Sequence, residues 1–270
     1  MPMRKFLCLL MAMLIMFTMF GCVEPERPVL RVAMSPDFPP MEFIDPAASG
    51  QDRFVGFDVS LAKYLARDLG MDLQILPMDF EACLDAVEAG EVEMAISGFS
   101  WLPDRAERFN LSDTYHAGNN SSSQVLLARE ADANRFDSPA AFEGVRVGTQ
   151  NASLQNWLTN QQLPGAVIIC FGDLDSGVDL LLNGSIDALA VADGNAAAIL
   201  ASKTGLAIAD YRFEVTEELT DNLIILKKGN DDLTAQVNAL LAKAEAAGYY
   251  NQWYAAALEL AGTNPTHTGE

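Results

Sequence analysis

The segment Leu84–Gly98 reads LDAVEAGEVEMAISG, with apolar residues at helical spacing, a stop at Gly90 and then an apolar strand-like run. A later segment, Val178–Ala192, reads VDLLLNGSIDALAVA and repeats the order of helix, glycine, acid and apolar strand. The spacing from the glycine to the strand is the same in both segments. This echo predicts two similar α/β lobes.

Strand-like and helix-like runs alternate on both sides of these segments, which is typical of an α/β protein with mostly parallel sheets. Each inner strand ends in polar residues, Ser97-Gly98 in one segment and Asp193-Gly194 in the other. Ligands of open α/β sheets bind beyond the carboxyl ends of the strands. Two such ends facing each other predict a ligand cleft between the lobes.

The composition excludes several classes of function. The chain has 270 residues, 17 Lys+Arg against 37 Asp+Glu and a formal net charge of −20, so a surface for nucleic acid is excluded. His116 and His267 are the only histidines, which argues against a Ser-His-Asp hydrolase. The sequence shows no cluster of metal ligands, and we expect no metal, no cofactor and no catalytic residues.

The N-terminal segment has the pattern of an export signal. Arg4 and Lys5 precede an apolar run from Phe6 to Phe20, which is too short to span a bilayer. Gly21-Cys22 at its end resembles the bacterial lipoprotein box, although Phe20 departs from that pattern. We expect a signal peptide over 1–21, a lipid on Cys22 and a tether over 22–29, which places the protein outside the cytoplasm on a membrane. An uncleaved anchor or ordinary secretion is the alternative.

Several short motifs, in this order and spacing, resemble the polar amino-acid family of ABC-transporter solute-binding proteins (family 3). The motifs are Asp37–Phe43 (DFPPMEF), Gly56–Val59 (GFDV), Met78–Phe80 (MDF), Ile96–Ser100 (ISGFS), Pro103–Ala106 (PDRA), Ser112–Tyr115 (SDTY), Val147–Gln150 (VGTQ), Ile186–Ala188 (IDA) and Val191–Asp193 (VAD). The resemblance implies a two-lobe fold of the type II periplasmic-binding-protein class. It also implies a lobe 1 over 30–114 and 221–262, a lobe 2 over 115–220, hinge segments near 115–122 and 217–222, and a tail over 263–270.

A free amino acid carries a carboxylate and an ammonium, so its site needs a fixed cation and a fixed anion. Arg105 can hold a carboxylate through two parallel hydrogen bonds, and the resemblance assigns it that role. Asp193 follows a buried strand, where a ligand ammonium would offset its desolvation. The alternatives are a surface ion pair for Arg105 and a helix N-cap for Asp193.

The resemblance implies further contacts to the ligand. Ser97, Gly98 and Ser100 would supply polar groups of one turn, and the helix start at Ser153 and Leu154 would supply backbone N–H groups to the carboxylate. The remaining expected ligand-binding residues are two aromatic walls and three polar side chains: Phe38, Phe80, Gln150, Gln155 and Ser35. Core packing for the aromatics and solvated surface positions for the glutamines are the alternatives.

Relatives that bind Lys or Arg commonly place an acid at the position of Ser35. Asp37 lies nearby, but neighbouring side chains of a strand point to opposite sides, so it need not replace that acid. No Lys or Arg lies within 35–43 or 150–155, which argues against an acidic ligand. The sequence therefore predicts an uncharged polar or sulfur-containing amino acid, resembling glutamine or cystine.

The predicted function is capture of a free amino acid by lobe closure and its delivery to an ABC permease with its ATPase. An enzyme resembling cyclohexadienyl dehydratase, with Glu42 as a candidate acid, and an amino-acid sensor are the alternatives. Cys83 and Cys170 fall in different predicted lobes, each among apolar neighbours. We therefore expect two buried free thiols rather than a disulfide.

Overall fold

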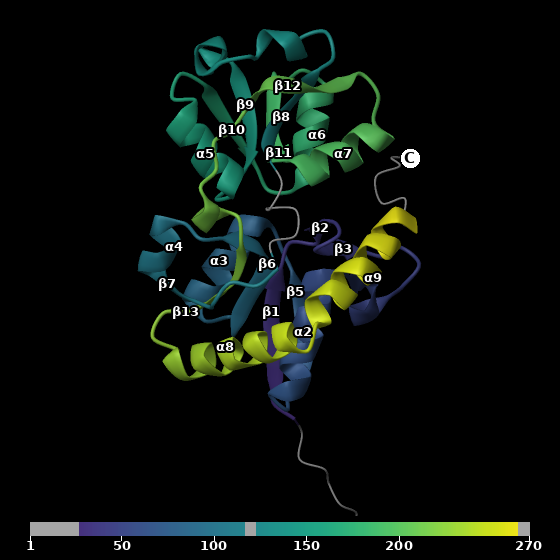
Figure 1. The fold of residues 1–270 in the computed structure, drawn as a ribbon, viewed down its shortest axis with the longest axis vertical. Coiled ribbons are helices and arrows are strands. Elements are labelled where there is room, and N and C mark those ends of the chain that lie inside the picture. Colours follow the sequence, from purple (N-terminus) through teal and green to yellow (C-terminus); the bar gives the residue numbers. More distant parts are fainter. Residues whose placement is uncertain (1–26, 117–122, 264–270) are drawn as a thin grey trace, which may run out of the picture.

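A computed structural model describes residues 27–116 and 123–263 of the chain. Cys22, the signal peptide, the 117–122 part of the predicted hinge and the predicted tail beyond 263 lie outside the described residues. The described chain forms two bodies, one above the other in Figure 1, each built around a five-stranded sheet. This arrangement confirms the predicted two-lobe α/β fold.

The sheet of lobe 1 has the strand order β5-β1-β6-β13-β7. Its strands are β1 (Val29–Met34), β5 (Asp72–Pro77), β6 (Met94–Ser100), β7 (Phe109–Leu111) and β13 (Asn222–Lys227). Strands β5, β1 and β6 run parallel, whereas β13 runs antiparallel to both β6 and β7. The chain therefore returns to this sheet after building lobe 2, as the yellow-green end of the ribbon in Figure 1 shows.

Lobe 1 also contains a small sheet and most of the long helices. The small sheet comprises β2 (Asp37–Phe38), β3 (Glu42–Ile44) and β4 (Phe54–Val55), with a 3-10 turn η1 (Gly50–Arg53) between the last two. The helices are α2 (Phe57–Asp68), α3 (Phe80–Ala89), α4 (Pro103–Arg108), α8 (Asp231–Ala246) and α9 (Tyr249–Thr263).

The sheet of lobe 2 has the order β10-β9-β11-β8-β12. Its strands are β8 (Gln124–Arg129), β9 (Arg146–Gln150), β10 (Val167–Phe171), β11 (Ala188–Ala192) and β12 (Leu206–Arg212). The helices are α5 (Leu154–Gln162), α6 (Leu174–Leu182) and α7 (Asp193–Ser202), with 3-10 turns η3 (Ala133–Arg135), η4 (Pro139–Phe142) and η5 (Glu217–Leu219). The echo segments thus form α3–β6 in one lobe and α6–β11 in the other.

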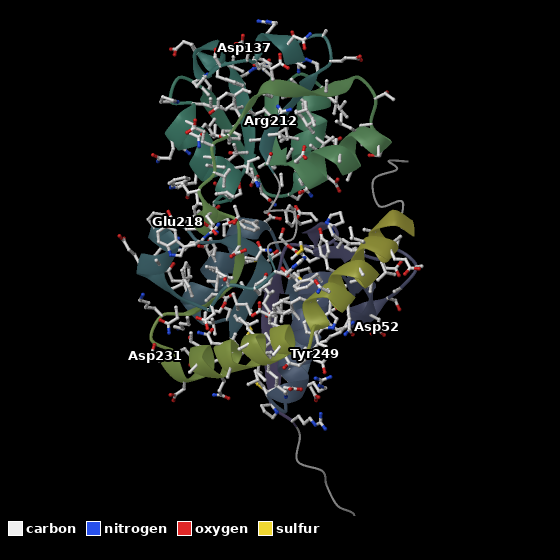
Figure 2. All side chains as sticks on the ribbon, in the orientation of Figure 1. Asp52, Asp137, Arg212, Glu218, Asp231 and Tyr249 are labelled. Carbon is white, nitrogen blue, oxygen red and sulfur yellow. The ribbon has the colours of Figure 1, made fainter. Side chains whose placement is uncertain are left out.

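Each sheet buries both of its faces. Lobe 1 has two hydrophobic cores, one around α2 and the C-terminal helices and the other around α3. Helix α9 lies along α2, where Phe57 contacts Tyr250 and Trp253. In lobe 2, α5 and α6 contribute to cores on opposite faces. The acidic residues labelled in Figure 2 lie on the outside of both lobes, so the large negative charge is spread over the surface.

Cys83 is buried on α3, as predicted, but the expectation of a second buried thiol is wrong, because Cys170 is exposed. Cys170 lies on β10, the edge strand of its sheet, where an apolar sequence does not guarantee cover on both faces. Both cysteines are free thiols. No helix within the described residues is long and apolar enough to cross a membrane.

Candidate functional site

A cavity lies between the two lobes, with about 370 Å³ of empty space when the part open to solvent is included. It is formed where β6 of lobe 1 ends and where β9 of lobe 2 passes into α5, the position that open α/β sheets use for ligands. Side chains of both lobes line it, and they are Asp37, Phe38, Glu42, Phe80, Ser97, Gly98, Ser100, Arg105, Gln150, Ser153, Leu154 and Gln155.

Direct hydrogen bonds join the lobes around this cavity. The Asp37 carboxylate of lobe 1 accepts from Gln150 Nε2 at 3.0 Å and from the Leu174 N–H, at the start of α6, at 2.8 Å. Arg105 donates to the Ala152 carbonyl of lobe 2 at 2.6 Å. The lobes are therefore in a closed arrangement.

Arg105 is the cation of the cavity, and it is only 1% exposed. Its guanidinium donates to the Ser100 carbonyl at 2.5 Å and lies 5.7 Å from the centre of the Phe80 ring. Its Nε atom is buried without a partner among the described residues. Burial lowers the pKa of Arg105 to about 10, so the group is charged at neutral pH. An anion entering the cavity would meet a desolvated cation with a free N–H.

The helix α4 that carries Arg105 starts in the way the sequence indicates. Leu102 is its N-cap residue and gives no side-chain cap, while Pro103 occupies the first turn. Proline suits this position because it has no N–H to leave unpaired and its φ is already helical. The short helix therefore presents Arg105 inward, with Arg108 on its outer side pairing with Glu88.

Asp37 and Glu42 form the acidic part of the lining. Burial raises the pKa of Asp37 to about 6, although the hydrogen bonds from Leu174, Ser35 and Gln150 act in the opposite direction. Burial also raises the pKa of Glu42 well above its usual value. The lining thus contains two carboxyl groups and a single guanidinium.

The start of α5 faces the cavity from lobe 2. The Ser153 side chain is a regular N-cap and accepts from the Asn156 N–H at 3.1 Å. The preceding Ala152 has a positive φ of 57°, which exposes its carbonyl to Arg105. Ser153 and Leu154 lie in the lining, at the positive end of the helix.

Most of the predicted site residues meet in this cavity. Ser97, Gly98, Ser100 and Arg105 line it with the two aromatics, the two glutamines and the start of α5. Among the described residues, those that line the cavity do not include Asp193 or Ser35. Asp193 is the half-buried first residue of α7, and its role toward an ammonium stays a prediction.

Two predicted details differ in the structure. Ser35 is buried and donates its hydroxyl to Asp37 at 3.1 Å, so it supports a residue of the lining. The backbone N–H of Gly98 donates to Asp58 at 2.8 Å and is therefore not directed to a ligand. Gly98 has a φ of 57°, and a Cβ here would lie 3.3 Å from the Phe38 ring, so a glycine keeps this wall open.

Sequence reasoning did not assign a binding role to Asp37. Three donors hold the Asp37 carboxylate in the lining. They are the Ser35 hydroxyl of the same segment, and Gln150 Nε2 and the Leu174 N–H of lobe 2. The sequence contained one signal for a binding role of Asp37. Asp37 and Glu42 flank the Phe38–Met41 turn, and this segment contains no Lys or Arg.

The family model of the bacterial extracellular solute-binding proteins, family 3, matches residues 30–258, and the chain belongs to this family. The arginine-binding extracellular protein ArtP of Bacillus subtilis (strain 168) is 30% identical over 57% of this chain and 58% of its own length. The L-cystine-binding protein TcyJ of Escherichia coli (strain K12) is 26% identical over 83% of this chain and 80% of its own.

A solved structure of an amino acid ABC transporter substrate-binding protein, AbpA from Streptococcus pneumoniae bound to L-arginine, superposes on the chain with a TM-score of 0.75. It is 26% identical and covers 86% of this chain and 95% of its own. The similarity therefore extends over both lobes.

Proposed function

We propose that this chain captures a free α-amino acid between its lobes and delivers it to an ABC permease powered by a separate ATPase. The observation that carries the proposal is Arg105, a buried cation in the lining of the interlobe cavity whose Nε has no hydrogen-bond partner within the described chain. A ligand carboxylate would pair with this charge and with the N–H groups at the start of α5. The names of the relatives, which bind arginine and cystine, support the same class of ligand.

The ammonium group of the ligand needs an anion on the other side of the carboxylate site. Asp193 stays the proposed partner, with the Ser97 carbonyl and the Ser100 hydroxyl as additional acceptors. Calorimetry on Arg105→Ala and Asp193→Ala tests this assignment, with circular dichroism as the control for folding. Each variant should lose about 2–5 kcal/mol of binding free energy, which is roughly 30- to several-thousand-fold in affinity. Wild-type affinity in either variant would contradict that residue's role.

The polar groups of the cavity indicate a side chain that donates hydrogen bonds. Gln150 Nε2 donates to Asp37 and to the Gly172 carbonyl, so both of its N–H bonds are used and its oxygen is left as an acceptor. Gln155 Nε2 donates to Gln124 at 2.7 Å. The half-buried Asp37 carboxylate is a further acceptor, and a cationic group beside it would offset the cost of its partial desolvation. We infer that a basic amino acid such as L-arginine is the first candidate.

An uncharged polar or sulfur-containing amino acid, predicted from the sequence, is the second candidate. The two glutamine side chains and the aromatic walls Phe38 and Phe80 support it. A thermal-shift screen of the amino acids and cystine separates the two, because a ligand at 100 times its Kd adds about 2.7 kcal/mol of stability. The largest shift with L-arginine or L-lysine supports the basic ligand, and the largest shift with glutamine or cystine supports the uncharged one.

The lipid anchor predicted at Cys22 stays a proposal, because Cys22 lies outside the described residues. Mass spectrometry of the native mature protein should find a diacylated Cys22 at the N-terminus. The Cys22→Ser variant should lose membrane attachment or keep its signal peptide. A mature N-terminus at another residue would contradict the anchor and leave the amino-acid site unaffected.

A binding protein without enzymatic activity fits the cavity better than a dehydratase does. A dehydratase needs a protonated acid aimed at its substrate, and Glu42 is the candidate by its raised pKa. However, both of its oxygens face protein groups, Ser97 on one side and Asp58 on the other. Recovery of the bound amino acid unchanged after long incubation with the protein is the expected result.

A further inference from the structure

Two buried carboxyl groups, Glu42 and Asp58, lie in contact beneath the ligand cavity. Glu42 belongs to β3 and is 1% exposed, while Asp58 belongs to the first turn of α2 and is fully buried. The two residues are neighbours: the Asp58 N–H donates to the carbonyl of Met41, the residue before Glu42, at 2.8 Å, and the two carboxyl groups accept from the adjacent residues Ser97 and Gly98. The amino-acid capture described above makes no use of this pair.

The other hydrogen bonds of the pair leave one oxygen on each carboxyl group unpartnered. Glu42 Oε1 accepts from Ser97 Oγ at 2.5 Å. Asp58 Oδ2 accepts from the Gly98 N–H at 2.8 Å and from Tyr115 Oη at 3.1 Å. Glu42 Oε2 and Asp58 Oδ1 are buried, and within the described chain no donor group reaches either atom. Buried polar atoms of this kind are rare in folded proteins and require an explanation.

We propose that Glu42 and Asp58 share one proton, held on Glu42 Oε2 and donated to Asp58 Oδ1, and that this pair positions the cavity relative to the hinge. A single proton gives a partner to both unpartnered oxygens at once. Asp58 is the ionised member because it already accepts two other hydrogen bonds, whereas Glu42 accepts one.

The pair joins two functional parts of the molecule. On one side, Glu42 and Gly98 belong to the lining of the cavity. On the other side, Asp58 holds Tyr115, whose backbone N–H donates to the Asn222 carbonyl at 2.8 Å. Tyr115 and Asn222 begin and end the two connections between the lobes. The shared proton would therefore fix the turn at Gly98 relative to Tyr115 and Asn222, which flank the connections between the lobes.

The environment of Glu42 favours retention of the proton. Asp37 on β2 adds a negative charge near Glu42, the Cys83 thiol on α3 and the Tyr115 hydroxyl are uncharged, and only Arg105, the cation of the same lining, acts in the opposite direction. Burial and the proximity of the two acids raise the pKa of Glu42 well above its usual value, and burial raises the pKa of Asp58 to about 7. Both shifts are upward, so the pair stabilises the fold at lower pH, and this contribution is lost as the pH rises from the ordinary carboxyl range through the raised pKa values.

Infrared difference spectroscopy on the ligand-free protein tests the proposal. At pH 8, ordinary carboxyl groups are ionised, so a protonated-carboxyl band that shifts in deuterium oxide reports the shared proton. The wild-type protein and the control Glu91→Gln, an exposed residue of the same lobe, should show the band. Glu42→Gln should lack it. Absence of the band in the wild type would overturn the proposal without requiring any variant to fold.

Stability against pH gives the second measurement. The amide of Glu42→Gln donates to Asp58 as the protonated acid does but binds no proton, so this variant should have a Tm at pH 7 no lower than that of the wild type and a flatter decrease from about pH 5 toward pH 9. Asp58→Asn can keep a carbonyl oxygen for Gly98 and Tyr115, but it replaces the other oxygen by an N–H₂ group that meets the O–H of Glu42, donor against donor, and should lower the Tm at pH 7. Equal losses in the two variants would refute the assigned position of the proton. Neither measurement uses an amino acid, so either result is independent of the proposed transport function.

Discussion

Replacement of Arg105 by methionine should separate binding from stability. Methionine fills a similar volume without the charge. In the ligand-free protein, the guanidinium is buried, donates to the carbonyls of Ser100 and Ala152, and forms no ion pair within the described chain. Because the proposed partner of Arg105 is a ligand carboxylate, we expect its loss to affect binding more than stability.

The magnitudes follow from the burial of this charge. The fall of the Arg105 pKa from 12.5 to about 10 corresponds to roughly 3 kcal/mol against the charged form at neutral pH. The two lost hydrogen bonds to a charged donor are worth roughly 1.5–3 kcal/mol each. These contributions oppose each other, and replacing a buried charge by a packed apolar side chain is often neutral or stabilising. We expect the free energy of unfolding to fall by no more than about 3 kcal/mol.

Binding should respond very differently. A ligand carboxylate left without its buried cation loses about 2–5 kcal/mol, and calorimetry with L-arginine and L-glutamine measures this loss. The control is Arg108→Met, which removes the same charge from the exposed side of α4 and should keep wild-type affinity. A loss of stability above about 4 kcal/mol in Arg105→Met would mark the residue as structural. Unchanged affinity would refute its assignment to the carboxylate.

The remaining predictions concern three other positions. The pKa of Asp37 is raised to about 6, and a cationic ligand favours the ionised form of this carboxyl group. The affinity for L-arginine should therefore fall as the pH decreases below about 6. Calorimetric titrations should show this dependence in the wild type but not in Asp37→Asn. Gly56→Ala should lower the Tm far more than Gly70→Ala. A Cβ at position 56 would lie 2.3 Å from the Met41 carbonyl oxygen. At Gly70 only the positive φ opposes the substitution, at a cost of roughly 1–2 kcal/mol in stability. In the native protein, a thiol reagent should react rapidly with Cys170 and slowly with the buried thiol on α3, and Cys170→Ser should remove the rapid phase.

The sequence was sufficient for the two lobes because the decisive patterns are local. Helix periodicity, Gly90 as the left-handed stop of α3 and the apolar run of β6 are all contained in a single segment. The same holds for Arg105, whose inward direction depends on a proline-started helix after β6. Motifs of this kind place a residue at the end of a strand, and the end of the strand is where the ligand cavity forms.

Residues whose environment comes from distant segments were not predictable in the same way. The alternation of side chains did not determine the role of Asp37, because its position depends on Gln150 and Leu174, which are 113 and 137 residues away. The exposure of Cys170 depends on β10 being an edge strand, which is a property of the strand order. A local sequence pattern does not determine how two lobes approach each other or the order of the strands in a sheet.

The closed arrangement explains how a ligand could favour closure. A ligand shifts an equilibrium between conformations only through contacts that differ between them. In the closed arrangement, Asp37 lies against lobe 2 and Arg105 donates to the Ala152 carbonyl, and neither charge has an ionic partner among the described residues. Under the proposed function, a zwitterion with a basic side chain would supply a carboxylate to Arg105 and a cation to Asp37. Pairing of these two charges, in addition to contact area, is therefore the basis on which this cavity would distinguish a basic amino acid from a neutral one.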